Sequence, residues 1–320
     1  MIFLNDSEVE TILNPAKVVS IIEEAMRYAE LHPESVPQRM HLQQDKNTML
    51  VMPAVGDNFY GTKVVSVYPE NPTIGRQMIS GYYVLNDRKY GAPVAVMSAE
   101  KLTAIRTGGI GGAAAKNLAH SNISAIGIIG CGVQGLAVAR SITSVLPIKK
   151  IFCYSRTRNS VLNFQAAFQK TFSDVAIEAC VHAEDVVSQT EVIVTATNAS
   201  NPVFDATITG IKGKTFIAMG SYRPQMQELP NEIFKQSGEI ILDAASIRKE
   251  TGDVLNPVKD GFVKEENIFT LGKLLSGERN SVANTKVFKS AGYALFDLFV
   301  ASEIYEEAVK RGLGKSFEFN

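Results

Sequence analysis

Cysteine and histidine are scarce in this chain of 320 residues. The three cysteines, Cys131, Cys153 and Cys180, are odd in number and include no closely spaced pair. That pattern excludes a disulfide framework and a CxxC metal or redox site, so we expect small, buried cysteines. The four histidines are scattered without an HxxxH motif or a neighbouring cysteine, and the sequence therefore predicts no metal site.

The chain also lacks a long apolar run and an excess of charge of either sign. Its most apolar stretch, residues 123–138, contains four glycines and Gln134, so no membrane-spanning helix is expected. Lysine and arginine number 32 against 33 aspartates and glutamates, which leaves no basic field for nucleic acid or anionic lipid. Residues 1–6 lack the basic start of a secretory signal, and we expect a cytoplasmic protein.

The length is enough for about two domains. Asn14 and Pro15 have the residue types of a helix start, and the apolar spacing that follows predicts a helix ending before Pro33. Short β-rich runs separated by turn residues, at 62–68, 80–85 and 92–97, predict a mostly antiparallel sheet. A helix rich in glycine and alanine is expected over 98–119.

From Ser124 the pattern changes to repeated strand, turn and helix. Strands are expected near 124–130, 150–155, 176–180, 191–196, 214–219 and 239–243. Alternation with helices implies parallel strands with right-handed crossovers, and hence a doubly wound α/β sheet whose ligand crevice lies at the strand C-termini. A long helix is expected over 285–311, ending at Gly312.

Residues 130–135 form a G-x-G-x-x-G motif directly after the first of these strands and directly before a helical run. In that context the motif predicts a dinucleotide-binding loop. Gly130 would permit the tight turn, Gly132 the close approach of the pyrophosphate, and Gly135 the packing of helix on strand. The predicted cofactor contacts of this loop are Gly130, Gly132, Val133, Gln134 and Gly135.

The second strand ends in Ser155, Arg156 and Thr157, without the acid that an NAD site usually offers to the ribose 2′-hydroxyl. Hydroxyl and guanidinium groups suit a 2′-phosphate, so NADPH is preferred and NAD is the alternative. The competing interpretation is that the arginines are solvated residues of a helix start. After the fourth strand, Thr195, Ala196 and Thr197 are expected at the nicotinamide end, or else cap the next turn.

A nicotinamide cofactor transfers a hydride to an acceptor carbon, and small acceptors are usually held by their carboxylate. The N-terminal part offers three candidate cations for this: Arg39, Lys63 and Arg106. Lys63 starts a run of β-branched residues, a position where a lysine leaves bulk solvent and can give or take a proton. The arginines would clamp the carboxylate. Taken singly, each cation is more often a solvated surface residue, and spacing alone does not distinguish them.

Several blocks together resemble the ornithine cyclodeaminase and mu-crystallin family. They are Lys63-Val-Val-Ser66 with Pro69-Glu-Asn-Pro72, Leu102-Thr-x-x-Arg106-Thr107, the glycine motif, Gly220-Ser-Tyr-Arg-Pro224, Lys249-Glu-Thr-Gly-Asp253 and Val287-Phe-Lys-Ser-Ala-Gly292. The resemblance implies a Rossmann doubly wound parallel sheet over 119–289. It also implies an α+β substrate-binding and dimerisation domain, formed by 1–118 with 290–320, and a homodimer. It further implies that Thr107, Ser290 and Gly292 contact the cofactor and that Ser221 and Arg223 contact the substrate.

Departures from the cyclodeaminase pattern select among the family's activities. Ser221 stands where that branch has a catalytic Asp, and Leu50 where it has a Glu, so the carboxylates for ornithine cyclisation are missing. Gln225 replaces a common Asp. The resemblance therefore favours an NAD(P)H-dependent reductase of a cyclic or linear 2-imino acid, such as pyrroline-2-carboxylate or piperideine-2-carboxylate. Ornithine cyclodeaminase or alanine dehydrogenase is the alternative, and a non-catalytic NADPH-binding protein is the alternative of another class.

Overall fold

The computed structural model describes residues 1–120, 122–205 and 207–318, and its chain divides into two compact units. The first unit comprises Met1–Arg106 and Tyr293–Asn320, and the second Thr107–Gly292. The second unit is thus inserted into the first. The change of unit falls inside helix α3 (Ala99–Leu118), and again just before helix α10 (Ala294–Arg311), whereas the sequence placed these boundaries at 118/119 and 289/290.

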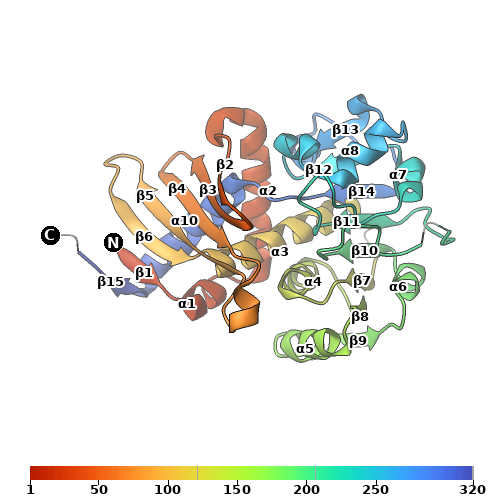
Figure 1. Cartoon of the computed structure of the whole chain (residues 1–320), viewed down its shortest axis with the longest axis horizontal. Coiled ribbons are helices and arrows are strands. Elements are labelled where there is room, and N and C mark those ends of the chain that lie inside the picture. Colours follow the sequence, from red (N-terminus) through yellow and green to blue (C-terminus); the bar gives the residue numbers. More distant parts are fainter. Residues whose placement is uncertain (121, 206, 319–320) are drawn as a thin grey trace. The chain divides into compact units, whose positions relative to one another are not determined.

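Among the described residues, the first unit is built on a seven-stranded sheet (Figure 1). β1 (Ile2–Leu4) pairs with β6 (Pro93–Ser98) in parallel, and every other described pairing of this sheet is antiparallel. The strand order is β15 (Lys315–Ser316), β1 (Ile2–Leu4), β6 (Pro93–Ser98), β5 (Ile79–Asp87), β4 (Phe59–Val67), β3 (Asn47–Val55) and β2 (Met40–Gln44). The predicted antiparallel sheet is confirmed, with β1, β2, β3 and β15 in addition to the expected runs.

Two long helices belong to this unit, α2 (Pro15–Leu31) and α10. The Asn14 side chain accepts a hydrogen bond from the Lys17 backbone at 2.8 Å, so α2 begins at the predicted cap and proline. The helix α10 packs against α2 and against β3, β4 and β5, and runs across the sheet in Figure 1. It ends at Gly312, whose φ of +65° is the left-handed conformation that glycine adopts at low cost. The short helix α1 (Asp6–Thr11) contacts β6.

The second unit contains, in the part of the chain that is described, an eight-stranded sheet whose pairings are all parallel. The order is β13 (Ile268–Thr270), β12 (Ile240–Leu242), β14 (Lys286–Lys289), β11 (Thr215–Ala218), β10 (Val192–Thr195), β7 (Ala125–Ile129), β8 (Lys150–Tyr154) and β9 (Ala176–Ala179). Order reverses on either side of β7, which makes the sheet doubly wound. The predicted fold class is confirmed.

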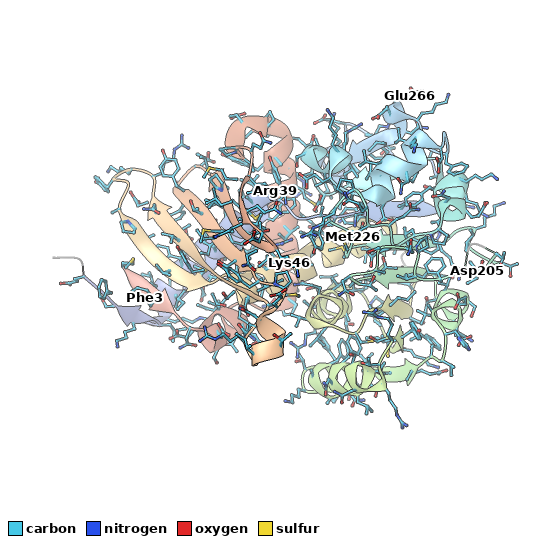
Figure 2. The ribbon with its side chains drawn as sticks, viewed as in Figure 1. Phe3, Arg39, Lys46, Asp205, Met226 and Glu266 are labelled. Carbon is cyan, nitrogen blue, oxygen red and sulfur yellow. The ribbon has the colours of Figure 1, made fainter. Side chains whose placement is uncertain are left out.

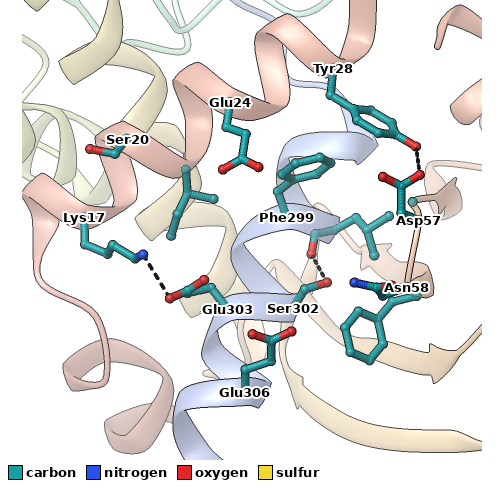
Figure 3. Close-up of a pocket in the computed structure, with 14 residues that line it drawn as sticks. Lys17, Ser20, Glu24, Tyr28, Asp57, Asn58, Phe299, Ser302, Glu303 and Glu306 are labelled. Atoms are coloured by element: carbon teal, nitrogen blue, oxygen red, sulfur yellow. Dashed lines mark hydrogen bonds and ion pairs between the residues drawn. The ribbon is translucent and has the colours of Figure 1, made fainter. Parts of the chain in front are cut away.

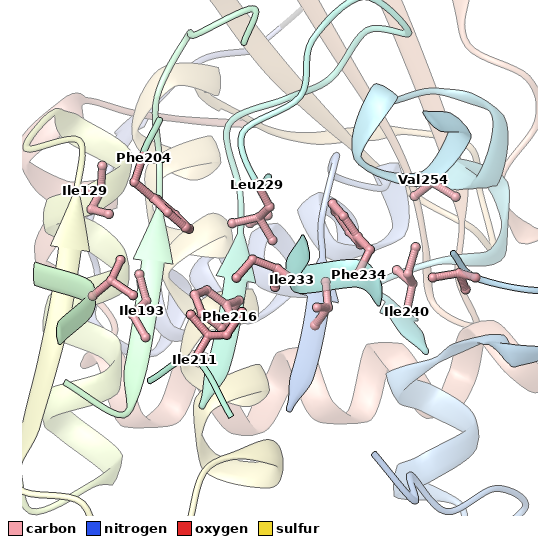
Figure 4. Packing of buried hydrophobic residues seen from close by; sticks show 14 of the residues in the cluster. Ile129, Ile193, Phe204, Ile211, Phe216, Leu229, Ile233, Phe234, Ile240 and Val254 are labelled. Atoms are coloured by element: carbon pink, nitrogen blue, oxygen red, sulfur yellow. The ribbon is translucent and has the colours of Figure 1, made fainter. Parts of the chain in front are cut away.

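Helices connect these strands, and apolar side chains from both fill the space between them (Figure 4). Phe216 of β11 and Phe234 of α7 (Asn231–Ser237) are fully buried in this cluster with Leu229. The connecting helices are α4 (Val133–Val145), α5 (Arg158–Gln169), α6 (Ala183–Gln189), α7 (Asn231–Ser237), α8 (Gly252–Lys259) and α9 (Leu271–Leu275). Because β7, β8, β10, β11 and β12 are buried over most of their length, their sequences are largely apolar runs, which made these strands predictable. The strand β9, at the edge of the sheet, is mostly exposed and includes Glu178.

The helix expected over 285–311 is wrong in its first part. Residues Lys286–Lys289 form β14, between β11 and β12, and the helix begins only at Ala294. Gly292 between them has φ of +82°, which no helix accommodates. The apolar residues of β14 fit a helical spacing with those of α10, so periodicity alone merged two elements that the backbone separates.

Candidate active site

Lys63 lies on the face of β4 that packs against α10, and only 3% of it is exposed. Its ammonium donates to Oδ2 of Asp297 at 2.7 Å and to the hydroxyl of Thr103 at 3.4 Å. An ammonium has three N–H donors, so one remains beyond these two contacts. Within the described residues, Lys63 is thus a buried cation with a donor to spare, as the sequence hypothesis requires.

Arg106 reaches the same carboxylate, because its Nε donates to Oδ1 of Asp297 at 3.3 Å. Asp297 is fully buried and shares its two oxygens between the lysine and the arginine. Arg39 precedes β2 (Figure 2), and its charge is near enough to lower the pKa of Lys63. The structure therefore gathers all three predicted cations in the first unit.

The pKa of Lys63 is lowered to about 8. Burial is the largest cause, because removing an ammonium from water penalises its charged form. The charge and hydrogen bond of Asp297 act in the opposite direction, while Arg106 and Arg39 lower the pKa further. A lysine in this range can exchange a proton near neutral pH, which an exposed lysine does poorly.

In the second unit, the glycine motif forms the turn between β7 and α4. Gly130 has φ of +106°, and an added Cβ there would lie 2.4 Å from the carbonyl oxygen of Ala196. At Gly135 it would lie 2.1 Å from the carbonyl oxygen of Gly130. At Gly132, by contrast, it would meet no atom within 4 Å. That open space beside the N-terminus of α4 is the cradle that a pyrophosphate fills in a Rossmann site.

The other residues predicted to contact the cofactor near this loop differ in their exposure to solvent. Val133, the first residue of α4, is 68% exposed. The Oε1 atom of Gln134 is buried, with no hydrogen-bond partner among the described residues. Thr107, also predicted to contact the cofactor, is buried in α3.

The end of β8 carries the residues predicted to select the cofactor. Arg156 donates from Nη2 to Oδ1 of Asn198 at 3.2 Å, which holds its guanidinium beside the chain segment that follows β10. Thr157 caps α5 by accepting from the backbone of Ser160 at 3.3 Å. No acidic residue lies in the first turn of α5, and Ser155 directly follows β8.

Thr195, Ala196 and Thr197 follow one another at the end of β10. Thr195 is fully buried, so its side chain faces the interior of the unit. Thr197 is held by Glu228, whose Oε1 accepts from the Thr197 backbone at 2.8 Å and from its hydroxyl at 2.7 Å. The other oxygen of Glu228 accepts from the Gly220 backbone at 2.6 Å. One buried carboxylate therefore ties together the segments that follow β10 and β11.

Glu228 is fully buried, and burial raises its pKa. The positive charge of Lys289 lowers that pKa, and the nearby carboxylate of Asp253 raises it again. Lys289 Nζ lies 3.6 Å from Asp253 Oδ2, and both side chains are fully buried. Neither Glu228 nor Asp253 was identified from the sequence as a site residue.

Ser221 and Arg223, predicted to contact substrate, occupy different environments. Ser221 is fully buried, donates to Asp253 and lies 2.6 Å from the hydroxyl of Thr251. Its side chain is thus engaged within the second unit. Arg223 is exposed, and its guanidinium stacks 5.2 Å from the centre of the Tyr222 ring.

Ser290 and Gly292, predicted near the cofactor, are both anchored to Asp243. The Ser290 hydroxyl donates to Asp243 Oδ2 at 2.6 Å, and the Gly292 backbone donates to the same oxygen at 3.1 Å. This carboxylate fixes the segment between β14 and α10.

A separate hollow of about 250 Å³ lies in the first unit among α2, α10 and the turn between β3 and β4 (Figure 3). Four acids line it, Glu24, Asp57, Glu303 and Glu306, and Lys17 pairs with Glu303 at 3.1 Å. Such a lining repels a carboxylate. The three cations do not line this hollow, so it is not the predicted substrate site.

Over the described ranges, no group of three or more histidines, cysteines, aspartates and glutamates could hold a metal ion. In the same residues no helix is both long and apolar enough to cross a membrane.

Asp297 was missed because spacing on a helix does not reveal a partner on a distant strand. A signal was nevertheless present: the acid interrupts the apolar run Ala294-Leu-Phe-Asp-Leu-Phe-Val-Ala301. An acid flanked by large apolar residues on a helix is rarely buried without a partner.

The family model for the ornithine cyclodeaminase/mu-crystallin family matches residues 1–312. A Delta(1)-pyrroline-2-carboxylate reductase of Bacillus cereus is 35% identical, with all of both chains covered. The structure of Thermococcus litoralis Delta(1)-pyrroline-2-carboxylate reductase with NADH and L-proline is similar with a TM-score of 0.90 at 28% identity, covering 99% of this chain and 100% of that one. An archaeal alanine dehydrogenase dimer with bound NAD gives a TM-score of 0.90 at 29% identity, covering 100% and 99%.

The chain belongs to the ornithine cyclodeaminase/mu-crystallin family. The family resemblance drawn from the sequence blocks is thereby confirmed, and a nicotinamide cofactor is common to these structural neighbours.

Proposed function

We propose that this protein is an NADPH-dependent reductase that converts a cyclic 2-imino acid, Delta(1)-pyrroline-2-carboxylate first of all, to the corresponding amino acid. The observation that carries the proposal is the buried cluster of Lys63 and Arg106 on Asp297, with Arg39 nearby. A small substrate anion is its natural complement. Support also comes from the Bacillus cereus and Thermococcus litoralis relatives, whose names state this activity.

The residues divide the chemistry between the two units. Arg39 and Arg106 bind the substrate carboxylate, and the free donor of Lys63 supplies a proton to the imine nitrogen. A reduced nicotinamide, when bound, supplies the hydride that adds to the imine carbon. The C=N bond thereby becomes CH–NH, with one hydride and one proton added. In the second unit the backbone at Gly132 and the N-terminus of α4 hold the pyrophosphate.

NADPH is proposed over NADH because of the residues that follow β8. Arg156 is oriented by Asn198, and no acid stands in the first turn of α5 to repel a 2′-phosphate. Replacing Arg156 by alanine should raise the KM for NADPH about tenfold or more and leave the KM for NADH nearly unchanged. Arg158→Ala, at the first position of the same helix, is the matched control. An equal effect on both cofactors would contradict the proposed phosphate contact.

A homodimer formed through the first unit is also proposed. The sheet face turned away from α10 carries two cross-strand rows of largely apolar residues, Val51–Val64–Tyr82 and Pro53–Thr62–Val84–Val96–Phe3. Tyr82 is 50% and Phe3 40% exposed. The other residues of these rows are partly exposed, and a contiguous, partly exposed apolar surface of this kind is typical of protein interfaces. Sedimentation should therefore give a dimer for the protein and a monomer for Tyr82→Lys; a monomer at micromolar concentration for both would refute this interface.

The decisive test follows the loss of reduced-nicotinamide absorbance with pyrroline-2-carboxylate and with piperideine-2-carboxylate, each with NADPH and with NADH. We expect fastest oxidation of NADPH by the five-membered imine. Turnover of alanine with NAD, or release of ammonia from ornithine, in place of imine reduction would assign another branch of the family. Tight NADPH binding without turnover on any of these would make the protein a binding protein.

A further inference from the structure

Asp297 is a buried acid that pairs with two of the three predicted cations. It comes from the first turn of α10, it is fully buried, and it divides its carboxylate between the Lys63 ammonium at 2.7 Å and the Arg106 guanidinium at 3.3 Å. Burying a carboxylate is costly unless it is paired and hydrogen-bonded, and Asp297 meets both conditions through these two cations.

The way Asp297 engages its partners leaves their substrate-binding groups available. It contacts Nε of Arg106, so neither terminal nitrogen of the guanidinium fork is engaged by this acid. It takes one of three ammonium hydrogens of Lys63, and Thr103 takes a second. Asp297 thus holds both cations, while one N–H of the Lys63 ammonium and the terminal nitrogens of the Arg106 guanidinium are not engaged by it.

The charge balance of the cluster depends on this one acid. Arg39, Arg106 and Lys63 bring three positive charges together, and like charges in a buried site disfavour one another. Lys63 is the member that can respond by losing its proton, because an arginine remains charged. Asp297 opposes that loss through both its charge and its hydrogen bond.

We propose that Asp297 is a positioning residue for imine reduction, which fixes the Lys63 ammonium and the Arg106 guanidinium in the orientation that binds the substrate carboxylate and keeps Lys63 in its proton-donating form. This inference rests on the proposed reductase function. Asp297 itself does not touch the substrate; it acts through the two cations.

The groups around Lys63 determine how its titration should change. They are Asp297 from α10, Arg106 from α3, Arg39 from the segment before β2, and the buried phenol of Tyr83, which pairs with Lys63 across β4 and β5. Burial and Asp297 raise the pKa of Tyr83, so the phenol stays neutral in this range. Asp297 is therefore the only described negative charge acting on Lys63, and its removal should lower the pKa of Lys63 below about 8.

The test compares Asp297→Asn, Asp297→Glu and a control, Glu303→Gln, which removes an acid that is 26% exposed from the same helix. The pH dependence of kcat/KM for pyrroline-2-carboxylate is measured with saturating NADPH. In Asp297→Asn the fall on the basic side should begin at least one pH unit lower, with at least a tenfold loss at pH 8 that diminishes towards pH 6. Asp297→Glu should recover part of that loss, and Glu303→Gln should match the wild type.

A second readout does not depend on turnover. The rate of carbamylation of Lys63 by cyanate, followed by mass spectrometry against pH, reports the protonation of its amine directly. The midpoint should be lower in Asp297→Asn than in the wild type. An unchanged midpoint, or a loss of activity equal at every pH, would overturn the role of Asp297. Absence of reductase activity in the wild type with a shifted midpoint would refute the proposed function instead.

If Asp297→Asn folds but is too unstable for kinetics, the double variant Lys63→Met/Asp297→Asn removes both members of the pair, and the thermal unfolding of the two variants is compared. It should unfold at a higher temperature than Asp297→Asn, because no unpaired ammonium is left buried. An equal or lower unfolding temperature would show that the two residues are not coupled, and would overturn the inference.

Discussion

Alanine substitutions at the second and third glycines of the 130–135 loop should separate cofactor binding from folding. Gly132 has φ of -89° and ψ of -168°, which alanine adopts readily, and its Cβ would meet nothing within 4 Å. Gly132→Ala should therefore be neutral or stabilise the apoprotein by about 0.4–1 kcal/mol, through the unfolded chain. The Cβ of Gly135→Ala would lie 2.1 Å from the Gly130 carbonyl oxygen, so overpacking should destabilise by about 1–3 kcal/mol.

The order of the two variants should be reversed for NADPH affinity: Gly132→Ala, the more stable variant, should bind NADPH more weakly. The methyl group of Gly132→Ala enters the space that we propose for the pyrophosphate, and a weakened hydrogen bond to a charged group costs about 1.5–3 kcal/mol. That corresponds to about a 10- to 150-fold rise in Kd. Folded Gly135→Ala, whose added methyl faces β7 and not the cradle, should lose less affinity than Gly132→Ala.

Urea unfolding is followed by far-ultraviolet circular dichroism, and NADPH binding by the fluorescence of the reduced nicotinamide. Gly132→Ala as unstable as Gly135→Ala would refute the steric reasoning. Unchanged NADPH affinity in Gly132→Ala would show that the pyrophosphate does not approach at this glycine.

Further predictions concern the ionisable groups. Lys63→Met should lower kcat by about 10²–10⁴-fold with NADPH affinity intact, in steady-state kinetics and fluorescence titration; retained turnover would exclude Lys63 as proton donor. Because the pKa of Lys63 is lowered to about 8, its ammonium is lost as pH rises through that value, and kcat/KM should fall about tenfold per unit above it. A profile flat to pH 9.5 would contradict this assignment. Glu228→Gln should raise the KM for NADPH more than the KM for the imino acid, because Glu228 ties Thr197 to Gly220. The control Glu232→Gln, on α7, should change neither KM. Equal effects of the two variants would contradict a role of Glu228 in the cofactor site.

Sequence alone predicted those parts of the fold whose signals are local. The strands β7, β8, β10, β11 and β12 are largely apolar runs bounded by turns, and α2 carries its own cap and proline. The strand β14 was missed because two apolar residues between two lysines resemble the start of the helix that follows. Its identity as a strand depends on β11 and β12, its neighbours on either side, which are distant in sequence.

In the candidate site, too, residues with local sequence signals were predicted and residues defined by distant partners were not. Gly130, Gly132 and Gly135 were recognisable because the loop, strand and helix that give them meaning are contiguous. The cations could be singled out only by family resemblance, since nothing in their spacing distinguishes them. Asp297 and Glu228 remained hidden, because a buried carboxylate is defined by its partners, and those partners come from other elements.

The insertion of one unit into the other has a consequence for how the protein is made. Residues 107–292 are continuous, so this unit can fold as soon as it has been synthesised. The pair between Lys63 and Asp297, by contrast, joins residues 234 positions apart. The nascent chain therefore carries its three cations without their acid until α10 emerges, and acquires the cofactor-binding fold before the completed cation cluster.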